Sequence, residues 1–282
     1  MQIILGKTAG FCYGGERALN EAKNELRKES KIYCLGEIVH NKSVVEDLEK
    51  NGMIFVKDIN QVSEKMIIRA HGASKDIYNK LKEKNIKIKD LTCPNVLKTH
   101  EVAEKYSSKN YFVILIGIKD HPESIGTLSF CGKNAMLIQE EEDIEESLKK
   151  IVRSKINNVL IMAQTTYNSK KFDNIAKKLQ EKLKNRNVEI KKTICGATEI
   201  RQKETIEISK TVDSMIIVGD KKSSNTNKLY DISKEKCKNV FFIQNADELN
   251  KDDFGRFNKI GIMAGASTPK KDIEEVIKKL EE

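Results

Sequence analysis

The hydrophobic residues of the chain follow two spacings, one typical of buried strands and one typical of amphipathic helices. Continuous apolar runs such as 111–118 and 215–218 suit strands that are buried on both faces of a parallel sheet. Between such runs, apolar residues recur about one helical turn apart, as at Ala18, Ala22 and Leu26. Strands that alternate with helices of this length predict βαβ units, parallel sheets and an α/β fold.

The expected elements extend along the whole chain. Strands are expected over 1–5, 31–35, 53–56, 66–68, 86–88, 111–116, 135–138, 159–162, 188–190, 215–218, 240–243 and 260–263. Helices are expected over 16–28, 74–84, 94–107, 199–210 and 270–280, around 44–48, before 152 and after 168. The segments 117–123 and 219–225 are expected to be loops, and no helix is predicted directly after either.

Three cysteines mark a repeat within this pattern. Cys12, Cys93 and Cys195 each follow a short apolar run, precede a helical segment and lie 24 positions before a glycine that ends a strand. These glycines are Gly36, Gly117 and Gly219, and four positions after them stand His40, His121 and Ser223. A fixed spacing of this kind indicates repeated structural units.

The repeat predicts three similar α/β domains around an approximate three-fold axis. Their expected extents are 13–92, 93–194 and 195–282, with the N-terminal strand in 1–12 completing the sheet of the third. In such an arrangement the three repeated cysteines converge at the centre. The polar loops then lie at the carboxyl ends of the strands, where ligands bind in parallel α/β sheets.

Composition narrows the class of protein. A chain of 282 residues with 39% hydrophobic residues and three prolines suits a compact globular protein of two or three domains. No apolar run approaches the roughly 18–20 residues of a membrane span. The N-terminal residues also lack the pattern of a secretory signal. We therefore expect a cytoplasmic protein without a membrane segment.

The net charge of +9 has two interpretations. The simpler one is a solvated, lysine-rich surface. The sharper one is a field that attracts an anionic substrate or an acidic redox partner. Nucleic acid is not an expected partner, because the basic residues are spread over many helices without interleaved aromatic side chains.

The cysteines suit a metal cofactor better than disulfides, because six cysteines in a long chain without a secretion signal point to metal binding or catalysis. Three repeated thiols lack the fourth ligand of a structural zinc site. They do suit an iron–sulfur cluster that keeps one iron open for a substrate. The other cysteines, Cys34, Cys131 and Cys237, do not share the spacing and are expected to be small buried residues.

The polar loops carry the remaining candidate chemistry. The hydrogen-bond donors among them suit phosphate oxygens. These donors are His40, His71, His121, Ser223, Ser224, Asn225 and Ser267. Glu123 follows His121-Pro122, and burial near a cofactor would raise its pKa enough for it to deliver a proton. Thr165 and Thr166 stand in the matching loop, within expected reach of Glu123. His100 is expected to be structural, and no nicotinamide or ATP motif is present.

At these residues the chain resembles the 4-hydroxy-3-methylbut-2-enyl diphosphate reductases, the family that catalyses the last step of the methylerythritol phosphate route to isoprenoids. The resemblance covers essentially the whole chain. Each motif alone is weak evidence, but many short motifs that occur together, in the order found in the family, are highly specific. The motifs are Gly10-Phe11-Cys12, Ile38-Val39-His40-Asn41, Ala70-His71-Gly72, Thr92-Cys93-Pro94, His121-Pro122-Glu123, Gln164-Thr165-Thr166, Ile194-Cys195, Ala197-Thr198, Arg201-Gln202, Ser223-Ser224-Asn225 and Ala264-Gly265-Ala266-Ser267. Departures from the usual pattern include Gly15, Arg69 and Asp120.

The resemblance implies a trefoil of three α/β domains around one 4Fe–4S cluster with three cysteine ligands, Cys12, Cys93 and Cys195, and one open iron site. The substrate would be an allylic alcohol diphosphate whose hydroxyl binds the open iron. Its diphosphate would lie among His40, His71, His121, Ser223, Asn225 and Ser267. Further substrate-binding residues would be Thr165, Thr166 and Ser224. Catalytic roles are implied for Glu123, Thr165 and His121, and two electrons from a ferredoxin or flavodoxin type of donor would expel water. The products would be isopentenyl and dimethylallyl diphosphate.

Two other functions fit the same cysteine pattern. Quinolinate synthase also places one cysteine from each of three units on a cluster and carries out a condensation with dehydration. A non-catalytic iron–sulfur sensor that binds a ligand is the second alternative. The position of Glu123 beside the donor loops favours reductive dehydration over sensing.

Overall fold

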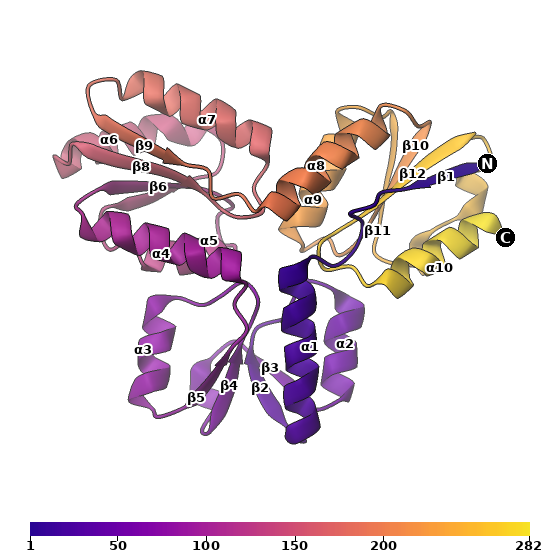
Figure 1. The fold of residues 1–282 in the computed structure, drawn as a ribbon, viewed down its shortest axis with the longest axis horizontal. Coiled ribbons are helices and arrows are strands. Elements are labelled where there is room, and N and C mark those ends of the chain that lie inside the picture. Colours follow the sequence, from indigo (N-terminus) through magenta and orange to yellow (C-terminus); the bar gives the residue numbers. More distant parts are fainter. The chain divides into compact units, whose positions relative to one another are not determined.

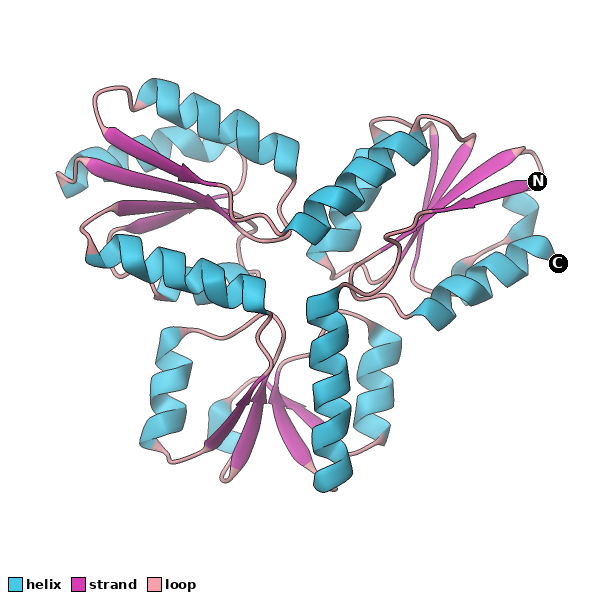
Figure 2. Ribbon diagram, in the orientation of Figure 1, coloured by secondary structure: helices cyan, strands magenta, loops and turns pink.

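The computed structural model describes residues Met1 to Glu282 and contains three four-stranded sheets, each flanked by helices (Figures 1 and 2). All neighbouring strands are parallel. The prediction of three similar α/β units with parallel sheets is therefore confirmed. None of the helices has the length and apolar character needed to cross a membrane.

The elements have the following bounds. The strands are β1 Gln2–Leu5, β2 Ile32–Leu35, β3 Met53–Val56, β4 Lys65–Ile68, β5 Lys87–Asp90, β6 Phe112–Ile116, β7 Ala135–Ile138, β8 Asn158–Ala163, β9 Asn187–Lys191, β10 Ser214–Val218, β11 Asn239–Ile243 and β12 Lys259–Ala264. The α-helices are α1 Tyr13–Lys28, α2 Lys42–Lys50, α3 Lys75–Glu83, α4 Pro94–Ser108, α5 Pro122–Ser129, α6 Ile144–Ser154, α7 Ser169–Lys182, α8 Gly196–Ser209, α9 Ser224–Lys234 and α10 Lys270–Glu281. Short 3-10 helices lie at Ile59–Gln61, Glu141–Asp143, Ala246–Glu248 and Lys251–Asp253.

The chain divides into two compact units. The first unit comprises Met1–Asn20, Val39–Asn51 and Gly196–Glu282, and it contains the sheet β1-β12-β10-β11. The second unit comprises Glu21–Ile38 and Gly52–Cys195, and it contains the sheets β3-β2-β4-β5 and β7-β6-β8-β9. The extents of three separate domains, 13–92, 93–194 and 195–282 with 1–12, stay a prediction.

The three sheets share one strand order, which explains the repeat in the sequence. The strands β2, β6 and β10 occupy equivalent inner positions, and each is followed directly by one of the three spaced glycines. At the outer edge, β1 pairs in parallel with β12, as β5 pairs with β4 and β9 with β8. The N-terminal strand thus takes the edge position of the sheet formed by the C-terminal part of the chain.

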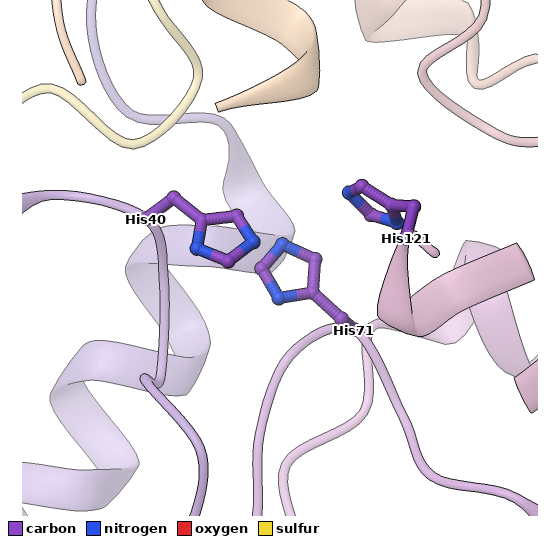
Figure 3. Close-up of side chains that lie close together, drawn as sticks. All are labelled: His40, His71 and His121. Atoms are coloured by element: carbon purple, nitrogen blue, oxygen red, sulfur yellow. The ribbon is translucent and has the colours of Figure 1, made fainter. Parts of the chain in front are cut away.

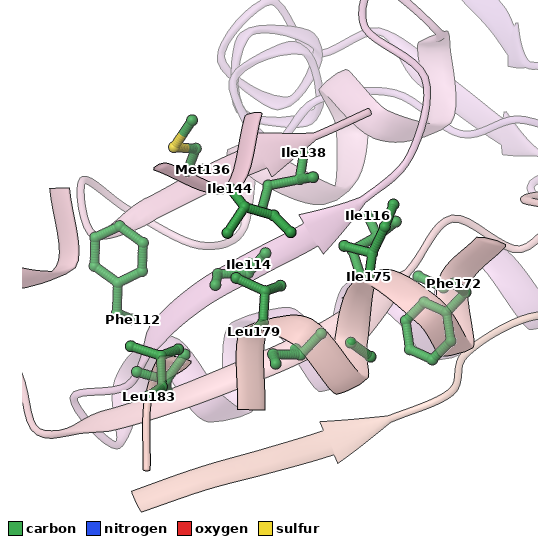
Figure 4. Packing of buried hydrophobic residues seen from close by; sticks show 14 of the residues in the cluster. Phe112, Ile114, Ile116, Met136, Ile138, Ile144, Phe172, Ile175, Leu179 and Leu183 are labelled. Carbon is green, nitrogen blue, oxygen red and sulfur yellow. The ribbon is translucent and has the colours of Figure 1, made fainter. Parts of the chain in front are cut away.

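The sheet β7-β6-β8-β9 shows how the alternation of side chains builds two cores. Residues Ile114 and Ile161 point to the face that α6 and α7 cover, and they pack with Phe172 and Leu179 of α7 (Figures 1 and 4). The intervening residues, such as Leu115, point to the opposite face, where α4 and α5 lie. Because both faces are buried, the strands read as continuous apolar runs in the sequence.

The sheet of the first unit has the same construction. Its strands present Ile216 and Ile262 to α10, and they present Ile217 and Met263 to the side on which Leu229 of α9 packs. The apolar residues of this sheet are thus used up in its two cores. The loops after the strands therefore carry the polar residues at defined places.

Two helices were not predicted from the sequence, and the predicted loops over 117–123 and 219–225 were wrong at their last two residues. Helix α5 begins directly after His121, and α9 begins directly after Ser223. Both residues are N-caps whose side chains accept a backbone N–H, from Glu123 and Thr226 respectively. Such caps replace hydrogen bonds that the first turn of a helix cannot make internally. The segments escaped prediction because few of their residues are apolar, so the helical spacing is weak.

Candidate functional site

The three repeated cysteines are held by the same backbone contact. Each cysteine follows an edge strand, and its N–H donates to a carbonyl in the loop after the neighbouring strand. The contacts are Cys12 to Ala266 at 3.0 Å, Cys93 to Ala70 at 2.9 Å and Cys195 to Thr165 at 2.9 Å. The repeat therefore places each cysteine beside one of the polar loops predicted from the sequence.

The thiols of these cysteines differ from the other three in exposure. Each stands directly before a helix, and all three are partly exposed and free of disulfides. The amides at the start of a helix stabilise negative charge on a thiolate or a cluster. By contrast, Cys34, Cys131 and Cys237 are buried, and burial raises the pKa of Cys131 to about 12 and that of Cys34 further. The three repeated thiols are therefore the ones suited to ligate a metal.

Within the second unit, Asn95 links the turn after Cys93 to Cys195. The Nδ2 atom of Asn95 donates to the Sγ atom of Cys195 at 3.0 Å, although 100 positions separate the two residues. In the first unit, the N–H of Gly15 donates to the Sγ atom of Cys12 at 3.4 Å. These donors stabilise negative charge on the two sulfur atoms.

Glu123 lies in the first turn of α5 and is a buried acid of the second unit. Only 1% of its surface is exposed. Its Oε1 atom accepts from the N–H of Thr165 at 2.6 Å, and its Oε2 atom accepts from the Thr165 hydroxyl at 2.9 Å. Burial raises the pKa of Glu123 to about 7, because desolvation of the charged form outweighs the two hydrogen bonds. The carboxyl group can therefore gain and lose a proton near neutral pH.

His121 stands next to this carboxyl group and is oriented by its own helix. Its Nδ1 atom accepts from the N–H of Glu123 at 3.1 Å, so the proton of the neutral ring lies on Nε2. The ring meets that of His71 edge to face, with 5.4 Å between the ring centroids (Figure 3). His121 is consequently set to donate from Nε2, as a phosphate oxygen requires.

Gln164 is a residue of this site whose role sequence reasoning missed. It is fully buried, and its Oε1 atom accepts from the N–H of Ile118 at 2.9 Å. Its Nε2 atom donates to the hydroxyl of Thr166 at 3.1 Å. A Cβ atom at Gly117 would lie 3.1 Å from Gln164, so glycine is needed there for close approach. Gln164 thus fixes the loop after β6 against the loop after β8. The sequence feature that could have indicated this role is a polar residue directly after a buried strand.

In the first unit, the polar residues gather at the start of α9. Ser223 is its N-cap, and Ser224 and Asn225 form its first turn. Asn225 is only 4% exposed, yet neither its amide nitrogen nor its amide oxygen has a hydrogen-bond partner. Nearby in the same unit, the hydroxyl of Ser267 donates to the carbonyl of His40 at 2.8 Å.

This arrangement has the character of an anion site. The first N–H groups of a helix carry partial positive charge and point outward. A buried amide without partners costs about 1–3 kcal/mol, so a bound ligand that supplies the missing hydrogen bonds is favoured. The serine hydroxyls of Ser223 and Ser224 add further donors.

Two departures from the family pattern have local explanations. A Cβ atom at Gly15 would lie 3.1 Å from Phe11 and 3.2 Å from the carbonyl of Ala266, so a larger residue requires a shift of these neighbours. Asp120 has a φ of 61°, in the left-handed region that glycine adopts without cost. Aspartate is one of the few other residues that visits this region readily.

The fold and the site together define a class of α/β proteins with repeated parallel sheets. In this class, a partly exposed cysteine follows one edge strand of each sheet, and polar hydrogen-bond donors lie at the ends of the strands. The family model of the LytB protein matches residues 3–281, so the chain belongs to the LytB protein family. Among curated relatives, the 4-hydroxy-3-methylbut-2-enyl diphosphate reductase of Clostridioides difficile (strain 630) is 40% identical over 284 residues, covering 100% of this chain and 99% of the relative. That of Caldanaerobacter subterraneus subsp. tengcongensis is 38% identical, covering 99% of this chain and 96% of the relative.

Solved structures agree with this family. The E-1-hydroxy-2-methyl-but-2-enyl-4-diphosphate reductase from Plasmodium falciparum matches with a TM-score of 0.90 and 30% identity, covering 98% of this chain and 87% of that chain. A second solved structure is described as (E)-4-hydroxy-3-methyl-but-2-enyl diphosphate reductase, the terminal enzyme of the non-mevalonate pathway. It matches with a TM-score of 0.70 and 38% identity, covering 100% of this chain and 99% of that chain.

Proposed function

We propose that this protein is an enzyme that reduces 4-hydroxy-3-methylbut-2-enyl diphosphate to isopentenyl and dimethylallyl diphosphate, the last step of the methylerythritol phosphate route. Two electrons and two protons enter, the carbon–oxygen bond to the hydroxyl group breaks, and one water leaves. The observation that carries the proposal is the match, over nearly the full length of both chains, to relatives named as this reductase. The site residues described above supply the binding and proton chemistry that the reaction needs.

The proposed cofactor is one 4Fe–4S cluster held by Cys12, Cys93 and Cys195, with one iron left open. The donor set supports this assignment, because these thiols are partly exposed and stand before helices, whereas the other cysteines are buried. When bound, such a cluster supplies electrons one at a time and a Lewis-acidic iron. The protein's part is to position the three sulfurs and to stabilise their negative charge.

We assign the binding of the substrate to the polar donors that the sequence predicts. In the first unit these are His40, Ser223, Ser224, Asn225 and Ser267, and in the second unit they are His71, His121 and Thr166. The unpartnered amide of Asn225 and the start of α9 support an anion there. The Nε2 proton of His121 supports a further contact to an anionic oxygen.

We assign the delivery of protons to the pair Glu123 and Thr165. With a pKa near 7, Glu123 is protonated in a substantial fraction of molecules at neutral pH. The Thr165 hydroxyl bonds its Oε2 atom, so a proton on the carboxyl group can pass along this contact. His121, which bonds the N–H of Glu123, holds the first turn of α5 in place.

The electron donor in this proposal is a ferredoxin or flavodoxin type of protein. Such donors are acidic, and the net charge of +9 favours their approach. A cytoplasmic location is part of the same proposal. The two alternatives, a dehydratase similar to quinolinate synthase and a ligand sensor, give way to the reductase because the family and its named members are reductases.

The test is anaerobic reconstitution with iron and sulfide, followed by an assay with the allylic diphosphate and a reduced viologen. We expect turnover by the wild-type protein and loss of turnover in Cys93→Ser. The matched control is Cys131→Ala, which changes a buried thiol outside the proposed ligand set and should leave turnover at the wild-type level. A protein with a full complement of iron that does not convert the substrate would reject the reductase.

A further inference from the structure

We propose that Asn95 is a positioning residue of the metal centre that raises the reduction potential of the cluster through a hydrogen bond to Cys195. The inference rests on the proposed function, because it requires a cluster on Cys93 and Cys195. It goes further by assigning a role to a residue that is neither a metal ligand nor a substrate contact.

The contact between Asn95 and Cys195 is direct and lies within one compact unit. The amide nitrogen of Asn95 lies 3.0 Å from the Sγ atom, a short distance for a hydrogen bond to sulfur. Asn95 occupies the second position of α4, two residues after Cys93. Its own carbonyl accepts from the hydroxyl of Thr99 at 2.9 Å, which holds this turn of the helix.

The donor to Cys195 differs in kind from the donor to Cys12. The sulfur of Cys12 receives the backbone N–H of Gly15 at 3.4 Å, a contact in which no side chain takes part. The sulfur of Cys195 receives a side-chain N–H from another helix. Substitution of Asn95 can therefore remove this bond without changing the local backbone.

A hydrogen bond to a ligand sulfur changes the potential in a known direction. Reduction adds one negative charge to a cluster, and an N–H directed at sulfur stabilises that charge more strongly after the electron arrives. The amide of Asn95 is uncharged, so it exerts this effect without titrating over the working pH range. Asn95 should therefore make the cluster easier to reduce.

The position of Asn95 allows a clean substitution, since it is exposed in the first turn of a helix and takes no part in a core. Asn95→Leu removes the donor at similar size. Asn95→Asp keeps the shape, removes the donor and adds a negative charge beside the sulfur, while aspartate suits the first turn of a helix. Asn79→Leu is the matched control, because Asn79 is also an exposed helical asparagine.

The experiment is an anaerobic redox titration of the full-length, reconstituted protein, followed by electron paramagnetic resonance and normalised to bound iron. We expect Asn95→Leu to shift the midpoint to a more negative potential. The expected loss in the one-electron reduction equilibrium is up to about tenfold, which corresponds to about 59 mV. Asn95→Asp should shift the potential further in the same direction, and Asn79→Leu should leave it unchanged.

Unchanged potentials in both Asn95 variants, measured on the fraction that holds a cluster, would overturn the inference. Loss of iron from the wild-type protein would instead overturn the proposed cofactor, so the two failures are distinguishable. The readout is a potential, and it does not depend on turnover of any substrate.

Discussion

Two hydrogen bonds join Glu123 and Thr165, which lie 42 positions apart in the sequence. Glu123 belongs to the first turn of α5, and Thr165 to the loop after β8. The pair is almost completely buried, and it holds a carboxyl group whose pKa is about 7. Such a group is a poor contributor to stability, because its charged form is desolvated. This buried carboxyl group is the basis of the proton-transfer role proposed above for Glu123.

Glu123→Gln should lower turnover strongly. The amide keeps the size of the side chain but cannot donate and regain a carboxyl proton, and the loss of a general acid typically costs roughly 10²–10⁴ in rate. Steady-state assays with the allylic diphosphate measure this loss. Iron content and the affinity for inorganic diphosphate serve as controls and should stay at wild-type levels. Undiminished turnover would reject Glu123 as the proton donor.

Thr165→Ala should raise the pKa of Glu123 above about 7. The hydroxyl of Thr165 stabilises the charged carboxylate, so its removal favours the protonated form, while the bond from the Thr165 N–H remains. In the wild-type protein, activity should fall as pH rises through about 7. The pH profile of Thr165→Ala should move to higher pH, and Thr165→Ser, which keeps the hydroxyl, should match the wild type. A shift to lower pH contradicts this assignment.

Asn225→Ala should weaken the binding of a diphosphate. The buried amide has no partner within the protein, so a bound diphosphate is its natural partner. We expect about a tenfold or larger loss of affinity for inorganic diphosphate, measured by calorimetry. Asn227→Ala provides the comparison, since the side chain of Asn227 already bonds the carbonyl of Ser223. Equal affinities in the two variants would remove Asn225 from the site.

His100 should make the free energy of unfolding depend on pH in the acid range. The residue is buried against Phe130, and burial lowers its pKa from 6.5 to about 4. Between these pH values the unfolded chain binds a proton that the folded protein does not, so the free energy of unfolding falls as pH decreases. Its contribution to this fall is roughly 3 kcal/mol. In His100→Phe, urea denaturation across the same range should show a correspondingly smaller fall; an identical fall would refute the assignment.

Gly265→Ala should destabilise the first unit. A Cβ atom there would lie 2.0 Å from the hydroxyl of Thr226, a buried residue of α9, so the loop or the helix must move. Overpacking of this kind costs about 1–3 kcal/mol. Gly255→Ala, where nothing lies within 4 Å of the added atom, should change the free energy of unfolding little. Denaturant titration of both variants measures the difference.

Much of the fold was predictable because buried parallel strands leave continuous apolar runs. The predicted strands over 53–56 and 135–138 agree with β3 and β7 at both ends, and the ends of all other predicted strands agree within one or two residues. Helices α5 and α9 were missed because their turns carry serine, threonine and asparagine in place of a clear apolar stripe. The repeat itself held the missing information, since α2 also begins shortly after His40.

The sequence named the candidate residues of the site, whose roles stay a prediction, but it did not give the hydrogen bonds among them. Cys12, Cys93 and Cys195 were selected by their spacing. In the structure, each of them makes the same type of backbone contact to the loop after the neighbouring strand. The bond from Asn95 to Cys195 and the unpartnered amide of Asn225 depend on the positions of side chains at the starts of α4 and α9. A linear pattern does not specify such distances, so these features emerge only from the folded chain.

The assignment of three cysteines to one cluster is tested most directly by the Mössbauer spectrum of the anaerobically reconstituted protein. We predict a spectrum in which one iron of four is distinct from the other three, because it lacks a cysteine ligand, and the distinct iron should change when the allylic diphosphate is added. Four equivalent irons, or a preparation that takes up no iron, would contradict the assignment.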